Sequence, residues 1–122
     1  MEALATNLLY FYRGVQEDRS VTSLEDIRSA CANTHQLVWF YTDWCGHCQR
    51  FEPMWQQLKD TNKLPVSFLR CDCDKHRDIA THYNVEGYPT LKLVLKGNCD
   101  QSITFEEERT PQNIKTWLLK SI

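Results

Sequence analysis

The sequence has no apolar run that could cross a membrane, because the longest one, residues 8–12, falls far short of the roughly 20 residues that a spanning helix needs. It also has no excess of charge of one sign, since fourteen Lys and Arg face sixteen Asp and Glu. Nucleic acids bind basic surfaces that neutralise phosphates. Glycine and proline number four each and form no linker, and no repeat is present. We therefore expect no membrane partner and no nucleic-acid partner.

What is present is a hydrophobic fraction of 42% and an aromatic fraction of 11% in 122 residues, enough to build one core. A typical domain has roughly 100 to 200 residues, so 1–122 is predicted to be a single domain. Residues 1–12 carry Glu2 as their only charge and no convincing cleavage site, so we interpret them as structure and not as a secretory signal. The last four residues carry no retention signal, and the sequence assigns no compartment.

The hydrophobic pattern predicts an α/β fold with the order βαβαβαββα. Strands joined by helices run parallel, a terminal hairpin is antiparallel, and helices must cover both faces of such a mixed sheet. The expected strands are residues 8–12, 37–41, 66–71, 91–96 and 103–105, with 13–21 as a polar connection. The expected helices are residues 23–33, 45–58, 74–83 and 110–122.

Local signals predict where three helices begin. Ser23 and Asp26 have the spacing of a capping box, and Asp74 can cap the short third helix. Thr110 precedes Pro111 as an N-cap before a first-turn proline. The last helix is expected to bury one stripe, formed by Ile114, Trp117, Leu118 and Ile122.

The most informative segment follows the central strand and reads Trp44-Cys45-Gly46-His47-Cys48. Cys45 is expected at the N-terminus of the second helix, where free backbone N–H groups and the helix dipole favour its thiolate, the nucleophile of thiol–disulfide exchange. Cys48 lies one turn later and deeper, so it can attack a mixed disulfide and release the substrate. His47 adds a donor or a positive charge next to the Cys45 sulfur, which predicts a more oxidising disulfide.

With these residues, nearly the whole chain resembles the thioredoxin superfamily, and within it the catalytic a-type domains of protein disulfide isomerase. Besides the cysteine motif, the resemblance rests on Pro53, on Asp72-Cys73, on residues 83–90 and on Arg109 ahead of Ile114 and Trp117-Leu118. It implies the thioredoxin fold, a redox-active disulfide between Cys45 and Cys48, and no separate cofactor or metal.

The resemblance also implies roles for residues outside the motif. A cis peptide before Pro89 places the backbone of Tyr88 next to the dithiol, where it receives an extended substrate strand. Arg109 approaches Cys48 and eases its deprotonation. Trp44 is interpreted as a partly exposed substrate platform. The candidate catalytic residues are therefore Cys45, Gly46, His47, Cys48 and Arg109, and the candidate substrate-binding residues are Trp44, Tyr88 and Pro89.

Three positions depart from the family pattern. Trp39 stands where the family usually has a buried carboxylate beneath the inner cysteine, and Arg70 stands where a Lys pairs with that acid. Asp43 replaces a frequent proline before the motif. Without the acid, only water, His47 or an approach of Arg109 remains to ease loss of the inner cysteine's proton, so slow substrate release is predicted at neutral pH.

The four remaining cysteines leave alternatives open. Cys31 lies on the apolar stripe of the first helix and is expected to be a small buried hydrophobe. Cys71 and Cys73 are core thiols, an auxiliary pair with Cys99, or sites of oxidative damage. A zinc site that combines Cys71 and Cys73 with the C-x-x-C pair is disfavoured by spacing, since a zinc ribbon needs two C-x-x-C knuckles.

The leading interpretation is a thiol-disulfide oxidoreductase of the protein disulfide isomerase type that forms, reduces or rearranges disulfides in proteins. Its expected partners are unfolded or disulfide-containing polypeptides and a redox partner such as glutathione, an oxidase or a reductase, and it is expected to be a monomer. By resemblance it belongs in the endoplasmic reticulum or secretory lumen, with a stand-alone cytoplasmic protein or an excised domain as alternatives. Two other functions stay open: a chaperone-like binding module that uses Trp44 and Tyr88, and a cytosolic thioredoxin-like reductant, for which Pro is expected in place of His47.

Overall fold

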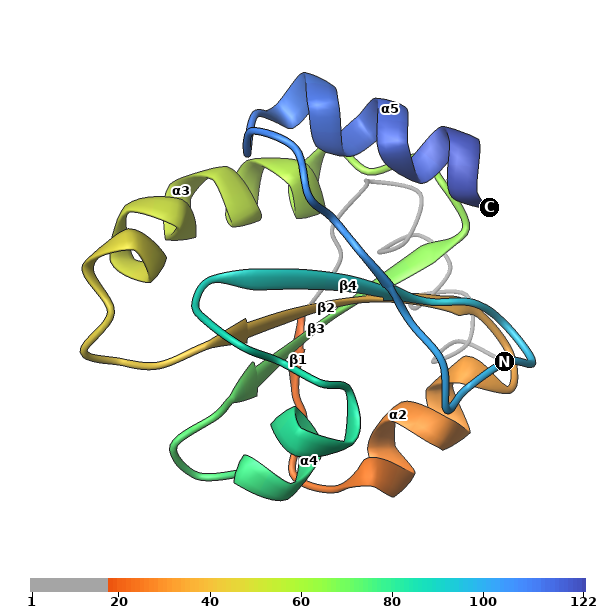
Figure 1. Ribbon diagram of the computed structural model, residues 1–122. Helices are drawn as coiled ribbons and strands as arrows, with labels where there is room; N and C mark the ends of the chain where they lie inside the picture. Colours follow the sequence, from red (N-terminus) through yellow and green to blue (C-terminus); the bar gives the residue numbers. More distant parts are fainter. Residues whose placement is uncertain (1–17) are drawn as a thin grey trace, which may run out of the picture.

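The computed structural model describes residues 18–122 and shows one mixed five-stranded sheet between two pairs of helices (Figure 1). The strand order in the sheet is β1-β3-β2-β4-β5. The strands are β1 (Arg19–Ser20), β2 (His35–Tyr41), β3 (Val66–Asp72), β4 (Thr90–Val94) and β5 (Ile103–Thr104). The helices are α2 (Leu24–Cys31), α3 (Gly46–Asp60), α4 (Arg77–His82) and α5 (Pro111–Ser121). Helices α3 and α5 lie on one face of the sheet, and α2 and α4 lie on the other.

The described elements follow the predicted order βαβαβαββα, but the first strand differs from the expected one. Residues 8–12 lie outside the described residues. β1 falls within the segment expected to be a polar connection, where Arg19 pairs with Leu69 and Ser20 with Arg70 in parallel register. Neither residue is apolar, so the pairing with β3 defines this strand and the hydrophobic pattern does not reveal it. No helix in the described part of the chain is long and apolar enough to span a bilayer.

The central strand β2 explains why the sheet has two cores. It pairs in parallel with β3 and antiparallel with β4. Successive side chains of a strand point to opposite faces. Leu37 and Trp39 accordingly pack with α3 and α5, whereas Val38 and Phe40 pack with residues of α2 and α4. The prediction that this unbroken apolar run is a strand covered on both faces is therefore confirmed.

Two of the three predicted helix starts are confirmed. Ser23 and Asp26 form the capping box of α2, and the Thr110 side chain accepts a hydrogen bond from the backbone N–H of Asn113 at the start of α5. The prediction for Asp74 is wrong, because His76 occupies the N-cap of α4 without a side-chain cap, and Asp74 instead accepts a hydrogen bond from the indole of Trp44.

Two expectations near the chain's end need correction. Ile122 does not face inward but is 37% exposed, because α5 ends at Ser121 and Ile122 lies beyond its last turn. The predicted hairpin forms between shorter strands than expected, since β4 stops at Val94. Gly97 has φ +79°, a left-handed conformation that glycine adopts at no steric cost, and this explains the turn after β4.

The expectation that Cys31 is a simple buried hydrophobe is wrong. It forms a disulfide with Cys99, which lies between β4 and β5, 68 residues further along the chain, with a Cα–Cα distance of 5.7 Å. Cys31 is fully buried, as its position on the apolar stripe predicted. That position is compatible with a free thiol as well as a disulfide, so it did not indicate that Cys31 has a partner. The alternative in which Cys99 pairs with Cys71 or Cys73 is excluded, because both of those cysteines are free.

Candidate active site

The two motif cysteines lie where the chain leaves β2 and enters α3. Cys45 is the N-cap residue of α3, and its Sγ accepts a hydrogen bond of 3.2 Å from the backbone N–H of Cys48. Both cysteines are free, and their exposed fractions are 6% for Cys45 and 2% for Cys48. An N–H group aimed at the Cys45 sulfur stabilises negative charge there, because a helix N-terminus leaves its first amides without intrahelical partners. The predicted position of both cysteines at the helix start is confirmed.

Cys48 lies in an environment that opposes ionisation. Burial raises the pKa of its thiol, and the hydrogen bond with Cys45 raises it further, to about 12. The positive charge of Arg109 acts in the opposite direction and lowers this pKa. The two thiols therefore differ in their surroundings, since the Cys45 sulfur accepts a backbone N–H at the helix start and the Cys48 thiol is held in its protonated form.

Tyr88, Pro89 and Trp44 gather next to Cys45. The Tyr88–Pro89 peptide is cis, and the carbonyl oxygen of Tyr88 lies 3.7 Å from the Cys45 Sγ, within reach of the thiol as donor. Trp44 is 69% exposed, and its ring packs edge-on against Tyr88 at a centroid distance of 6.2 Å. Its indole N–H donates to the Asp74 carboxylate at 2.8 Å, which holds the exposed ring in place.

The remaining predicted site residues are His47, Gly46 and Arg109. His47 is exposed and its Nδ1 accepts a hydrogen bond of 2.9 Å from the Arg50 guanidinium, which cannot itself act as acceptor. Gly46 is the first residue of α3, and a Cβ there would meet the same guanidinium at 3.4 Å. Arg109 is exposed just before the N-cap of α5.

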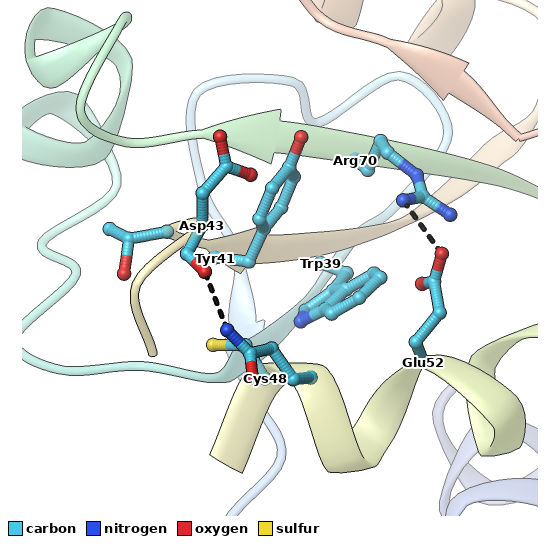
Figure 2. Close-up of a pocket in the computed structure, with 8 residues that line it drawn as sticks. Trp39, Tyr41, Asp43, Cys48, Glu52 and Arg70 are labelled. Carbon is cyan, nitrogen blue, oxygen red and sulfur yellow. Dashed lines mark hydrogen bonds and ion pairs between the residues drawn. The ribbon is translucent and has the colours of Figure 1, made fainter. Parts of the chain in front are cut away.

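A cavity of about 290 Å³ lies next to Cys48, between β2, β3 and α3 (Figure 2). Trp39 forms one of its walls and is 2% exposed. Its ring packs against Phe51 and Trp55 at centroid distances of 5.3 and 5.4 Å. Trp39, which stands where the resemblance implied a buried acid, is therefore part of an aromatic cluster.

The thioredoxin family model matches residues 19–120. The chain belongs to the thioredoxin family. It is 47% identical over 68 residues to protein disulfide isomerase-like 2-2 of Oryza sativa subsp. japonica, which covers 54% of this chain and 18% of that protein. It is 33% identical over 101 residues to the thioredoxin domain-containing protein 5 homolog of Drosophila melanogaster, which covers 80% of this chain and 24% of that protein.

A solved structure is similar over most of the domain. The first thioredoxin domain of mouse protein disulfide-isomerase A4 superposes with a TM-score of 0.71 at 25% identity, covering 83% of this chain and 72% of that one. The predicted thioredoxin fold and the predicted likeness to protein disulfide isomerase domains are thus confirmed. The chain spans a quarter or less of the two curated relatives described above.

This thioredoxin domain carries a buried charge network that the sequence did not reveal. Asp18 accepts hydrogen bonds from Trp55 (3.1 Å), Lys59 (2.9 Å) and the Arg70 guanidinium. Despite its burial, these donors lower the pKa of Asp18 to about 2. Arg70 also binds the Glu52 carboxylate at 3.2 Å and lies 5.0 Å above the Trp39 ring. Arg70 therefore has two acidic partners, Asp18 and Glu52, in a chain that lacks the family's buried acid.

Glu52 is the site residue that the sequence analysis missed. It lines the same cavity as Cys48 and lies four residues after it on α3. Residues four apart on a helix are neighbours, so this spacing was the available signal. Asp18 gave no comparable signal, because its partners are 37 to 52 residues away in the sequence.

Cys71 and Cys73 lie in the second core, against α2 and α4, and are fully buried. Their hydrogen bond and burial raise the pKa of Cys71. Within residues 18–122, no group of three or more His, Cys, Asp or Glu side chains is arranged to hold a metal ion. The zinc alternative has no supporting site in this part of the chain.

Proposed function

We propose that this thioredoxin domain is a thiol-disulfide oxidoreductase of the protein disulfide isomerase type, with Cys45 as nucleophile and Cys48 as resolving cysteine. The observation that carries the proposal is the N-cap position of Cys45. The sulfur of Cys45 accepts a hydrogen bond from the backbone N–H of Cys48. A sulfur that accepts this bond at a helix N-terminus is favoured as thiolate, the attacking species in disulfide exchange.

The reaction proceeds in two exchanges. The Cys45 thiolate attacks a substrate disulfide, forms a mixed disulfide and releases one substrate thiolate. The Cys48 thiolate then attacks the Cys45 sulfur, which releases the second substrate thiolate and leaves the Cys45–Cys48 disulfide. Run in reverse, the same steps oxidise a substrate dithiol. Two cysteines supply all the redox chemistry, so the proposal includes no separate cofactor.

The surroundings of Cys45 suit an extended polypeptide. The carbonyl oxygen of Tyr88 is next to the sulfur, and the exposed Trp44 ring stands beside it. A backbone carbonyl at this place can pair with a substrate strand, and an exposed indole supplies apolar contact area. The proposed substrates are therefore disulfide-containing or unfolded polypeptides. Glutathione, an oxidase or a reductase would then reset the dithiol.

The disulfide between Cys31 and Cys99 is the kind of cross-link that is stable in an oxidising compartment. Disulfides that are structural persist in secretory and other oxidising compartments and are rare in the cytosol. Cys31 and Cys99 form such a cross-link away from Cys45 and Cys48. We propose that the domain works in the endoplasmic reticulum or secretory lumen.

The equilibrium of the Cys45–Cys48 pair with glutathione tests this function. We expect a reduction potential near the roughly −180 mV of protein disulfide isomerase and not near the roughly −270 mV of thioredoxin. We also expect the reduced domain to rescue a protein with scrambled disulfides, with the Cys45→Ser/Cys48→Ser variant as control. A potential near that of thioredoxin would make the domain a reductant, and a dithiol that exchanges with neither reagent would leave only a binding role.

A further inference from the structure

The resolving step needs a proton acceptor, and this inference rests on the proposed function. Cys48 must lose its thiol proton before its sulfur can attack the mixed disulfide. Burial raises the pKa of that thiol, and Cys48 stays buried beneath Cys45 when the substrate is attached. A buried thiol of this kind ionises poorly at neutral pH without a nearby base. The resolving step therefore requires a base among the side chains around Cys48.

The cavity next to Cys48 holds three polar atoms with nothing to bind. Trp39 Nε1, Thr42 Oγ1 and Glu52 Oε2 are buried, and no group within residues 18–122 forms a hydrogen bond with them. All three residues line this cavity together with Cys48. Buried polar atoms that lack a protein partner are normally satisfied by ordered water. A volume of about 290 Å³ has room for several waters, at roughly 30 Å³ each.

The two oxygens of the Glu52 carboxylate differ in their partners, because one is bound by a protein side chain and the other has no hydrogen-bond partner among the described residues. Arg70 binds Oε1 at 3.2 Å. The guanidinium is itself fixed by Asp18 and by the ring of Trp39 beneath it. Oε2 has no such partner and is buried. Figure 2 shows the Glu52 side chain reaching from α3 toward Arg70 beside the Trp39 indole, with Cys48 on the other side of that indole.

Several other charged or titratable groups lie near Cys48 and Glu52, and each of them is less suited than Glu52 to accept the Cys48 proton. They are Tyr41, Asp43, Cys45, His47, Arg70 and Arg109. His47 is exposed, and its Nδ1 already accepts a hydrogen bond from Arg50. Arg70 and Arg109 are cations, and burial raises the pKa of Tyr41, which keeps its phenol protonated. Cys45 is bonded to substrate in the mixed disulfide. Asp43 is exposed, and its carboxylate points away from Cys48 in Figure 2.

We propose that Glu52 accepts the Cys48 proton through water in this cavity, and that Arg70 is the positioning residue that aims it. The Cys48 proton passes to water while a water proton passes to Oε2. The Cys48 thiolate then attacks the Cys45 Sγ, a Cys45–Cys48 bond forms, and the bond from Cys45 to the substrate sulfur breaks. Cys48 is oxidised, Cys45 keeps the oxidation state that it had in the mixed disulfide, the departing substrate sulfur is reduced, and Glu52 returns its proton through water to that departing thiolate.

The test is the rate of the resolving step in the whole chain, measured against pH. A substrate disulfide whose two thiols carry different chromophores reports both exchanges, because release of the first thiol follows mixed-disulfide formation and release of the second follows resolution. Glu52→Gln keeps the shape of the side chain and an oxygen for Arg70 but cannot take a proton. Asp43→Asn is the matched control, because it removes an equal charge from another acidic residue that lines the same cavity.

We expect Glu52→Gln to slow resolution about 100-fold at pH 7, at the lower end of the range for general acid–base catalysis. The deficit should shrink as pH rises, since hydroxide replaces the lost base. Asp43→Asn should resolve within about twofold of the parent, and Glu52→Asp should recover much of the rate. The direction is diagnostic, because removing an anion near Cys48 without any proton transfer would favour the Cys48 thiolate and speed resolution.

Unchanged or faster resolution in Glu52→Gln, with an unchanged pH profile, would overturn the role of Glu52 and leave the proposed function intact. A parent domain that forms no mixed disulfide would overturn both. Should Glu52→Gln fail to fold, the ¹³C chemical shift of the Glu52 carboxyl in the parent decides the matter. Its titration should change when the mixed disulfide is formed with Cys48 reduced, and an identical titration in the oxidised domain would overturn the inference.

Discussion

The two faces of the sheet hold cysteine pairs of opposite character. On the face covered by α3 and α5, Cys45 and Cys48 are three residues apart, free, and next to a cavity and buried charges. On the face covered by α2 and α4, Cys31 and Cys99 are 68 residues apart and joined. The core of the first face contains five aromatic residues, whereas the core of the second packs mainly aliphatic side chains and cysteines with Phe40 and Tyr83.

The difference shows what a cysteine needs for each task. A reactive pair needs a helix N-terminus, a separation of about one helical turn between the two cysteines and a path for protons, and these requirements bring polar groups into the core. A cross-link needs two distant segments held at a suitable Cα separation, and it limits the conformations of the unfolded chain. In this domain the face with the Cys45–Cys48 pair holds the buried ion pairs of Asp18, whereas the opposite face holds the disulfide and the more exposed pair of Arg28 with Asp100.

The largest effect should come from the reactive pair itself. Cys45→Ser is expected to abolish turnover, because no nucleophile remains to attack the substrate. Cys48→Ser should still allow the first exchange, but no second cysteine can then attack the Cys45 sulfur and release the substrate. Mixed disulfides with substrate proteins therefore accumulate. Non-reducing electrophoresis with a polypeptide substrate distinguishes the two variants. Labelling of Cys48 before Cys45 by limiting iodoacetamide in the reduced parent would reverse the assignment of nucleophile.

The next effect concerns the cross-link on the other face. Replacing Cys31 and Cys99 together with Ser removes the constraint on a loop of 68 residues and should lower the free energy of unfolding by about 4 kcal/mol. Urea denaturation of the oxidised proteins measures it, and the Cys45–Cys48 potential should stay unchanged. In excess reductant the parent should fall to the stability of the variant, and a stability difference that survives reduction would assign the loss to packing.

A smaller loss is expected for the ion network on the reactive face. The pKa of Asp18 is lowered to about 2, below its ordinary value of 3.8, so its carboxylate contributes stability above about pH 4 that is lost as the pH falls through about 2. Asp18→Asn should therefore cost about 2 kcal/mol at pH 7. Urea midpoints between pH 7 and pH 2 should converge for parent and variant. Parallel curves would show that Asp18 contributes through shape and not through charge.

The smallest effect is expected for the residue between the two reactive cysteines. His47→Pro should make the disulfide more stable and the domain more reducing, by about 30 mV, one tenfold step in the equilibrium constant. The Cys45 thiolate loses a favourable neighbour, while proline is accepted in a helix's first turn. The bond from Arg50 to His47 keeps the change modest. An equal potential for parent and variant in glutathione buffers would make His47 a spacer.

Features carried by short stretches of sequence were predictable. The doubly covered β2, the capping box of α2 and the Thr110-Pro111 start of α5 all depend on neighbouring residues, and each is confirmed. The position of Cys45 and Cys48 at the start of α3 followed from the end of an apolar strand and the beginning of a helical stripe. Asp74 shows the limit of such signals, since its carboxylate binds the Trp44 indole in place of a helix end.

The sequence by itself determined the order of elements from α2 to α5, the two covered faces of the sheet and the dithiol at the start of α3, because periodicity, caps and motif spacing are local properties of the chain. Only the tertiary structure decided that Cys31 pairs with Cys99, that Asp18 joins Lys59 and Arg70, and that Glu52 turns one oxygen toward the cavity of Cys48. These contacts join residues that are distant in sequence, or depend on which atom of a side chain is already bound. Periodicity carries no information about either, so packing of the sheet against its helices had to supply it.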